Sequence, residues 1–238
     1  MKPFLLFAHC RFDTPDPRDW HPNPMIHSST QLPWHVKAFL EKFQDKFRII
    51  FITTQPKFDK QLLKEYRIEH FIKRDNKGFD FMSWKEGLEY VYQQNYFSQL
   101  ILCNDSVFLR PEHTQVLYDY LSKDIDYIGL SFNPGYSTPA HIQSMFLIIS
   151  EKLVKSYIWK HFWANMVHEK IDKHHAVFNN EIGLYQAIAK MNFSYTSLNH
   201  TKYSGYDCDE YLNKPNPFIK IQRNELLYMV YKAKYYGY

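Results

Sequence analysis

Three small polar residues follow an apolar run near the middle of the chain, and their side chains could bind a ligand. The run Leu100–Cys103 is short and continuous, which is typical of a strand covered on both faces of a sheet. Asn104, Asp105 and Ser106 would then lie at the carboxyl end of that strand, where ligands bind in open α/β sheets. A carboxylate at this place can meet a substrate phosphate through a divalent cation. The same residue types also favour a simple turn, so this segment by itself predicts a turn or a ligand site with equal weight.

A second polar segment, Asn76 to Asp80, lies between an expected strand and an expected helix. Gly78 permits a turn with positive φ, and Asp80 is placed to cap the helix. Exposed N–H groups at such a helix terminus can bind an anion. For Asp80 alone, a role as the helix cap is the simpler interpretation. The chain contains neither the phosphate loop of P-loop ATPases nor the glycine fingerprint of Rossmann dehydrogenases, so neither class has support.

The second half of the chain contributes two more candidate segments. His141, Gln143 and Ser144 lead into an apolar strand expected at 145–149. His141 could bind a cation or a substrate hydroxyl, although a lone histidine is more often a structural residue. Glu181 is expected in the first turn of a helix, near the positive end of the helix dipole. This place is ordinary for a glutamate, and it also suits a general base directed into a cleft.

Another acidic segment, Asp124-Ile-Asp126, resembles the Asp-x-Asp cation motif of nucleotide-sugar enzymes. It precedes the strand expected at 127–130, which places it at the edge of a parallel sheet opposite to Asn104. We therefore expect a solvated turn there.

Strands and helices alternate four times before residue 131, which is typical of a parallel sheet with right-handed crossovers. The expected strands are 4–8, 48–54, 68–72, 100–103 and 127–130, and the expected helices are 36–43 with Pro33 in its first turn, 58–66, 81–92 and 111–121. Beyond residue 131 the pattern is less regular, with a strand at 145–149 and helices that carry Trp159, Phe162 and Trp163. The predicted fold class is α/β, with a mostly parallel central sheet flanked by helices and a mixed C-terminal extension. The proline-rich residues 10–30 are expected to form a long loop.

The composition predicts one ordered globular domain. The net charge of +4 favours an anionic ligand or an acidic membrane surface. The chain lacks the clustered basic residues that are typical of a nucleic-acid-binding protein. Three widely spaced cysteines, Cys10, Cys103 and Cys208, indicate a reducing compartment without structural disulfides. No apolar run approaches the ~18–20 residues that span a bilayer, so we expect a cytoplasmic protein, soluble or peripheral.

Residues 223–238 mix basic and aromatic side chains in a helical pattern. One interpretation is a helix that lies on the inner leaflet of the cytoplasmic membrane. The other, which we prefer, is a docked terminal helix with an aromatic tail.

Taken together, five segments resemble the rhamnan synthesis protein F family of bacterial polysaccharide enzymes. They occur in the family's order over about residues 70–225, and they are Asn76-Lys-Gly-Phe-Asp80, Asn104-Asp-Ser-Val107, His141-Ile-Gln-Ser144, Glu181-Ile-Gly183 and Pro217-Phe-Ile-Lys220. The resemblance implies a glycosyltransferase with a GT-A-like, nucleotide-diphospho-sugar-binding fold. It would add a sugar, rhamnose by the family's name, to a polysaccharide or lipopolysaccharide chain. Residues 1–131 would then bind the donor, residues 132–222 would face the glycan or lipid-linked acceptor, and residues 223–238 would form the terminal helix.

The resemblance also implies roles on the donor side. Asp105, with Asn104 or Ser106, would hold the donor diphosphate directly or through Mg²⁺ or Mn²⁺. Asp80 and the turn at Gly78 would contact the ribose or the sugar. Asn104-Asp-Ser provides one carboxylate where typical GT-A enzymes have the two of Asp-x-Asp. Dependence on a cation is therefore left open.

On the acceptor side, the resemblance implies a single inverting displacement. Glu181 would take the proton from the attacking hydroxyl, while His141 and Gln143 would orient the donor sugar or the acceptor. Two alternatives remain. One is a carbohydrate-binding module without enzymatic activity, and the other is a nucleotide-sugar hydrolase or a transferase of another sugar.

Overall fold

The computed structural model describes residues 2–9, 32–94, 98–135, 138–166, 173–199 and 217–220. The expected loop at 10–30, the expected terminal helix at 223–238, Cys10 and Cys208 lie outside these residues. Within them, no helix is both long and apolar enough to cross a bilayer.

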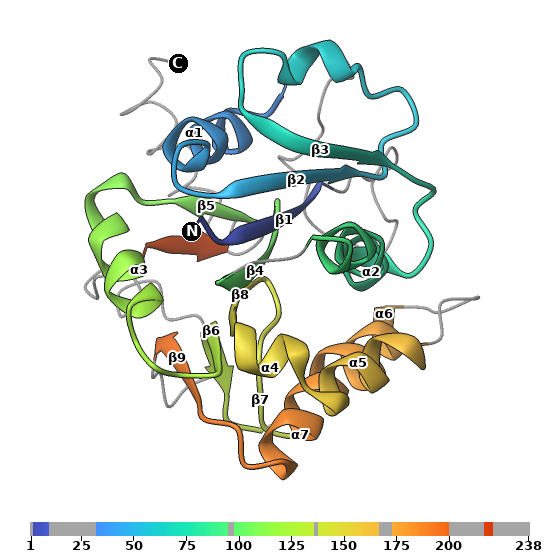
Figure 1. Cartoon of the computed structure of the whole chain (residues 1–238), viewed down its shortest axis with the longest axis vertical. Coiled ribbons are helices and arrows are strands. Elements are labelled where there is room, and N and C mark those ends of the chain that lie inside the picture. The colour runs from blue at the N-terminus through green and yellow to red at the C-terminus, as the bar shows by residue number, and fades with distance from the viewer. Residues whose placement is uncertain are drawn as a thin grey trace.

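An eight-stranded sheet forms the centre of the described structure (Figure 1), with strand order β3-β2-β1-β4-β8-β6-β7 and β9 paired with β6. The strands are β1 Phe4–His9, β2 Arg48–Thr53, β3 Ile68–Lys73, β4 Gln99–Asn104, β6 Tyr127–Asn133, β7 His141–Ile142, β8 Phe146–Ser150 and β9 Tyr195–Asn199. Strands β1 to β4 pair in parallel, whereas β8 runs antiparallel to both β4 and β6. The sheet is therefore mostly parallel with a mixed extension, as the sequence predicted.

Helices cover both faces of the sheet (Figure 1). One face carries α1 (Trp34–Phe43), α3 (Thr114–Leu121) and the small sheet of β5 (Val107–Leu109) and β10 (Phe218–Lys220). The other face carries α2 (Phe79–Tyr92), α4 (Glu151–Lys155), α5 (Tyr157–Ala164) and α7 (Gly183–Lys190). Alternate residues of β1 serve the two layers, since Leu5 packs in the core with α1 and Leu6 in the core with α2. The fold is GT-A-like.

The expected helix at 58–66 is wrong. This segment contains one 3₁₀ turn, Lys60–Leu63. The Asp59 side chain caps the turn by accepting a hydrogen bond from the Gln61 N–H at 2.9 Å. Only Leu63 of the turn is buried, so a longer helix would have little apolar surface to stabilise it.

Two smaller expectations also need correction. Pro33 precedes α1 as its N-cap residue and does not lie in the first turn, because its ψ of 145° is extended. The segment expected as one helix at 111–121 is a 3₁₀ turn, Pro111–His113, followed by α3, in which Leu117 is buried against the sheet.

The carboxyl ends of the parallel strands meet at one edge of the sheet. β1 ends at His9, β2 at Thr53 and β4 at Asn104, and helix α2 begins just beyond the end of β3. Residues 143–145, which connect β7 to β8 without belonging to either strand, lie at the same edge. The Met145 carbonyl accepts a hydrogen bond from the Asn104 N–H at 3.2 Å. This edge gathers the candidate residues.

Asp126 lies at the opposite edge, as the sequence predicted, but the expectation of a solvated turn is wrong for this residue. Its side chain is buried and accepts hydrogen bonds from Ser150 Oγ at 2.9 Å, Lys152 Nζ at 3.1 Å and the Ser194 N–H and Oγ at 3.1 Å each. Burial opposes ionisation, yet the bonds from Lys152, Ser194 and Ser150 lower the pKa of Asp126 below its usual value. Asp126 therefore ties together the ends of three segments.

Candidate functional site

The Asn104 side chain joins the end of β4 to the start of helix α2. Its Nδ2 donates a hydrogen bond to Asp80 Oδ2 at 2.7 Å. Its Oδ1 accepts hydrogen bonds from the Ser106 N–H at 3.2 Å and from Ser106 Oγ. The turn predicted from the residue types is present, and its side chains also reach the neighbouring helix.

Helix α2 begins with the backbone conformation that the sequence predicted. Gly78 is the N-cap residue with φ of 76°, in the left-handed region that favours glycine. Asp80 does not cap the helix, because it lies in the first turn and binds Asn104. The first N–H groups of α2 therefore lie beside the Asn104 turn, where the positive end of the helix dipole favours an anion.

Asp105 is buried on the α1 side of the sheet, with 3% of its surface exposed. Its N–H donates to the Ala8 carbonyl at 3.1 Å, which extends the pairing of β1 and β4, and its own carbonyl accepts from His35 Nε2 at 3.0 Å. The carboxylate Oδ2 lies 3.9 Å from His9 Nε2. The opposite nitrogen of His9, Nδ1, lies 2.9 Å from Thr53 Oγ1. Two histidines therefore flank Asp105.

Negative charge accumulates at the end of β4. Burial raises the pKa of the Cys103 thiol, and the carboxylates of Asp105 and Asp80 raise it further. A divalent cation would neutralise such charge, but in the described part of the chain no three His, Cys, Asp or Glu side chains come together as a metal-binding group. Any cation here would therefore need ligands from the substrate as well as from the described residues.

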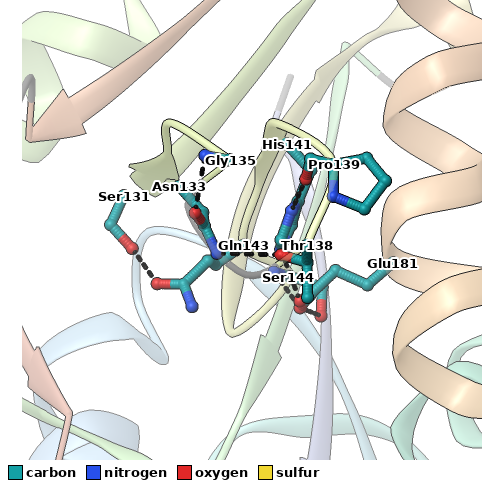
Figure 2. Close-up of polar contacts among 9 residues, drawn as sticks. All are labelled: Ser131, Asn133, Gly135, Thr138, Pro139, His141, Gln143, Ser144 and Glu181. Carbon is teal, nitrogen blue, oxygen red and sulfur yellow. Dashed lines mark hydrogen bonds and ion pairs between the residues drawn. The ribbon is translucent and has the colours of Figure 1, made fainter. Parts of the chain in front are cut away.

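A second group of contacts surrounds Glu181 (Figure 2). His141 Nδ1 lies 2.7 Å from the Pro139 carbonyl, and a carbonyl oxygen only accepts, so this nitrogen carries a proton. His141 Nε2 lies 3.1 Å from Glu181 Oε1. The other oxygen of Glu181, Oε2, accepts from the Ser144 N–H at 2.7 Å and from Ser144 Oγ. Three donor groups thus converge on one carboxylate.

The pair of His141 and Glu181 is charged. Burial disfavours the imidazolium, but the hydrogen bond to Glu181 and the bond to the Pro139 carbonyl raise the pKa of His141. Burial likewise disfavours the carboxylate, but the bonds from His141 and Ser144 lower the pKa of Glu181. Both shifts favour imidazolium and carboxylate at neutral pH.

The sequence suggested that Glu181 lies in the first turn of a helix, and this expectation is wrong. Helical backbone runs from α6 (Lys173–His175) through a π-helical segment (Ala176–Ile182) into α7, and Glu181 lies near the end of the π-helical segment. Its carboxylate is stabilised by hydrogen bonds, and the helix terminus that was expected to do this is absent. Leu184, Tyr185 and Ile188 of α7 are buried against the sheet.

Gln143 lies apart from this pair. Its Oε1 accepts a hydrogen bond from Ser131 Oγ at 2.6 Å, on the side of the segment that faces β6 (Figure 2). Gly78, Asp80, Asn104 and Ser106 thus form one group, Asp105 extends it towards α1, and His141 and Glu181 form a second group.

Sequence analysis missed the environment of Asp105. His9 follows the predicted strand 4–8 directly, so its place at the edge of the parallel sheet could have been inferred. His35 lies in the first turn of α1 and had no distinguishing pattern, because its contact is with a backbone carbonyl 70 positions away.

The family is identified by direct comparison. The family model described as rhamnan synthesis protein F matches residues 49–224, more than half of the chain. The chain belongs to the rhamnan synthesis protein F family. The match includes the Asn104 turn and Glu181, whereas His9 and His35 lie outside it. A search of curated proteins found no match.

Solved structures share the fold of this family member at low identity. A Bacillus anthracis protein assigned as a glucose-1-phosphate thymidylyltransferase, solved with sucrose, aligns with a TM-score of 0.55 at 8% identity over 100% of this chain and 97% of that chain. HddC from Yersinia pseudotuberculosis aligns with a TM-score of 0.51 at 15% identity over 96% and 97% of the two chains. A glycosyltransferase involved in glycosylation of the major capsid of PBCV-1 aligns with a TM-score of 0.49 at 12% identity over 95% and 100%. The first two alignments support the fold.

Proposed function

We propose that this protein is a glycosyltransferase that moves a sugar from a nucleotide-diphospho-sugar to a glycan acceptor. The name of its family suggests rhamnose as the sugar, and the acceptor that we propose is a growing cell-surface polysaccharide or lipopolysaccharide. The observation that carries the proposal is the group of polar side chains around Asn104 at the carboxyl edge of the sheet, beside the start of helix α2. That edge is where open α/β folds bind their ligands.

On the donor side, the first N–H groups of α2 and the Asn104 turn receive the diphosphate. The helix N-terminus stabilises negative charge that develops on the leaving group. Asp80 and the turn at Gly78 contact the ribose or the sugar. Asp105 is the residue that would hold Mg²⁺ or Mn²⁺ together with the donor diphosphate, and such a cation supplies positive charge to the departing phosphate.

On the acceptor side, Glu181 acts as the general base. A carboxylate offers about four lone pairs and the three donors described above occupy three, which leaves one on Oε1 for an acceptor hydroxyl. The side chain keeps 15% of its surface exposed. His141 and Gln143 orient the donor sugar or the acceptor.

The reaction is then a single inverting displacement. The acceptor oxygen attacks the anomeric carbon as its proton passes to Glu181. The bond from that carbon to the phosphate oxygen breaks, and its electron pair leaves with the nucleoside diphosphate.

The test is to incubate the protein with nucleotide sugars and oligosaccharide acceptors and to measure free nucleoside diphosphate and the mass of the glycan. We expect both to increase together, with the glycan heavier by one sugar. Nucleoside diphosphate release without glycan growth would indicate a hydrolase. Glycan binding without response to any nucleotide sugar would overturn the proposal in favour of a carbohydrate-binding module.

A further inference from the structure

Two consecutive residues, Ser144 and Met145, connect Glu181 to the Asn104 turn. Both hydrogen-bond donors of Ser144, its N–H and its Oγ, bind Glu181 Oε2. The Met145 carbonyl accepts the Asn104 N–H at 3.2 Å. A single stretch of backbone therefore links the helix that carries Glu181 to the end of β4.

The bond of Met145 to Asn104 continues the pairing of β4 and β8, whereas Ser144 lies outside regular strand pairing. β7 ends at Ile142 and β8 begins at Phe146, so Ser144 and Met145 lie in the interruption between them. Gln143 is fixed by its N–H bond to the Ser131 carbonyl at 2.9 Å. Beyond that bond, the orientation of the Ser144 peptide depends on Glu181.

The other end of the link sets the geometry of the donor side. Asn104 holds Asp80 through its Nδ2 and Ser106 through its Oδ1. A shift of the Met145 carbonyl changes the position of the Asn104 backbone, and with it the side-chain contacts that join β4 to the start of α2.

We propose that Glu181 is also a positioning residue for the donor site, because its carboxylate fixes the Ser144–Met145 backbone that holds the Asn104 turn. This inference rests on the proposed function and adds a second role for Glu181 that is independent of the acceptor. The carboxylate lies on a continuous helical run, with the neighbouring Asn180 and Ile182 buried, so it is held on a rigid element.

The negative charge of Glu181 is needed for this role. In Glu181→Gln, one oxygen is replaced by an NH₂ group that only donates. The remaining oxygen can keep both donors of Ser144, and His141 can release its Nε2 proton and accept from the NH₂ group, but these bonds are no longer charge-assisted and hold the Ser144 peptide less strongly.

Hydrogen exchange tests the link without any ligand. In Glu181→Gln, we expect the amide of Asn104 to exchange about tenfold faster, because its bond to Met145 opens more often. Ser144→Ala keeps the backbone donor and loses the hydroxyl, so its effect should be smaller and in the same direction. The matched control is Asp126→Asn, which replaces a buried carboxylate at the opposite edge that accepts four hydrogen bonds. It should lower the thermal midpoint, and exchange at Asn104 should change no more than exchange at the other amides of β4.

Binding of nucleoside diphosphate, measured with UDP, dTDP, GDP and CDP in the absence of acceptor, is the second readout. We expect about tenfold weaker binding in Glu181→Gln and no change in Asp126→Asn. A residue that acts only as the base would leave this affinity unchanged. Wild-type exchange and wild-type affinity in Glu181→Gln would overturn the inference. If the wild-type protein binds none of the four, the proposed donor is wrong, and the exchange experiment still decides whether Glu181 positions the turn.

Discussion

Replacement of Asp105 by Asn is expected to reduce sugar transfer by about 10²–10³-fold or more while the fold is retained. The new side chain has the same shape. The hydrogen bonds of this residue to Ala8 and His35 are made by its backbone, so they survive the substitution. What is lost is the negative charge 3.9 Å from His9 at the end of β4. Initial rates of nucleoside diphosphate release, together with circular dichroism and the thermal midpoint, measure both parts of the prediction.

The control is Asp45→Asn. Asp45 pairs with Arg67 on the surface, with 63% of its side chain exposed, and this pair has no contact with the carboxyl edge. Its rate should equal that of the wild-type protein. An Asp105→Asn variant that folds and retains more than half of the wild-type rate would remove Asp105 from the mechanism.

Replacement of Glu181 by Gln is expected to lower kcat by about 10²–10⁴-fold at saturating donor and acceptor, because the amide cannot accept the proton of the attacking hydroxyl. Since the pKa of Glu181 is lowered, the carboxylate stays ionised through the neutral range. On the acid side, the wild-type kcat should therefore fall only when the pH drops below the usual range of a glutamate.

Glu151→Gln is the matched control for this variant. Glu151 belongs to the same half of the chain and pairs with Lys155 at the surface, so the substitution should leave kcat unchanged. If Glu181→Gln changed only the KM for the donor and left kcat intact, Glu181 would be a positioning residue without a base function.

The strands were predictable because burial dominates their sequence. The apolar runs at 4–8, 48–54 and 100–103 are almost completely buried in the sheet, and no other local structure hides them as well. The parallel crossovers give these strands one direction, but they do not fix the order in which β1 lies between β2 and β4. The position of the Asn104 turn at the carboxyl edge follows from that direction.

Features that depend on long-range polar contacts were not predictable. The local sequence of Asp126 suggests a turn, but its partners Ser150 and Ser194 come from segments far along the chain. The helix start expected at Glu181 failed for a related reason, since helical backbone already begins at Lys173 and hydrogen bonds from His141 and Ser144 stabilise the carboxylate. A single sequence shows which side chains are present, but hydrogen bonds between residues far apart in the chain can be identified only once the fold is known.

The central claim is that the carboxyl edge binds a nucleotide-diphospho-sugar, and a thermal-shift panel tests it most directly. The panel contains dTDP, UDP, GDP and CDP with their sugars, each with Mn²⁺, Mg²⁺ or a chelator. A ligand at a hundred times its dissociation constant stabilises a protein by ~2.7 kcal/mol, which raises the midpoint by roughly 5–11 °C in a domain of this size. We predict such a shift with the nucleotides of one base and its loss in Asp105→Asn. A flat response to every nucleotide, with and without cations, would contradict the account.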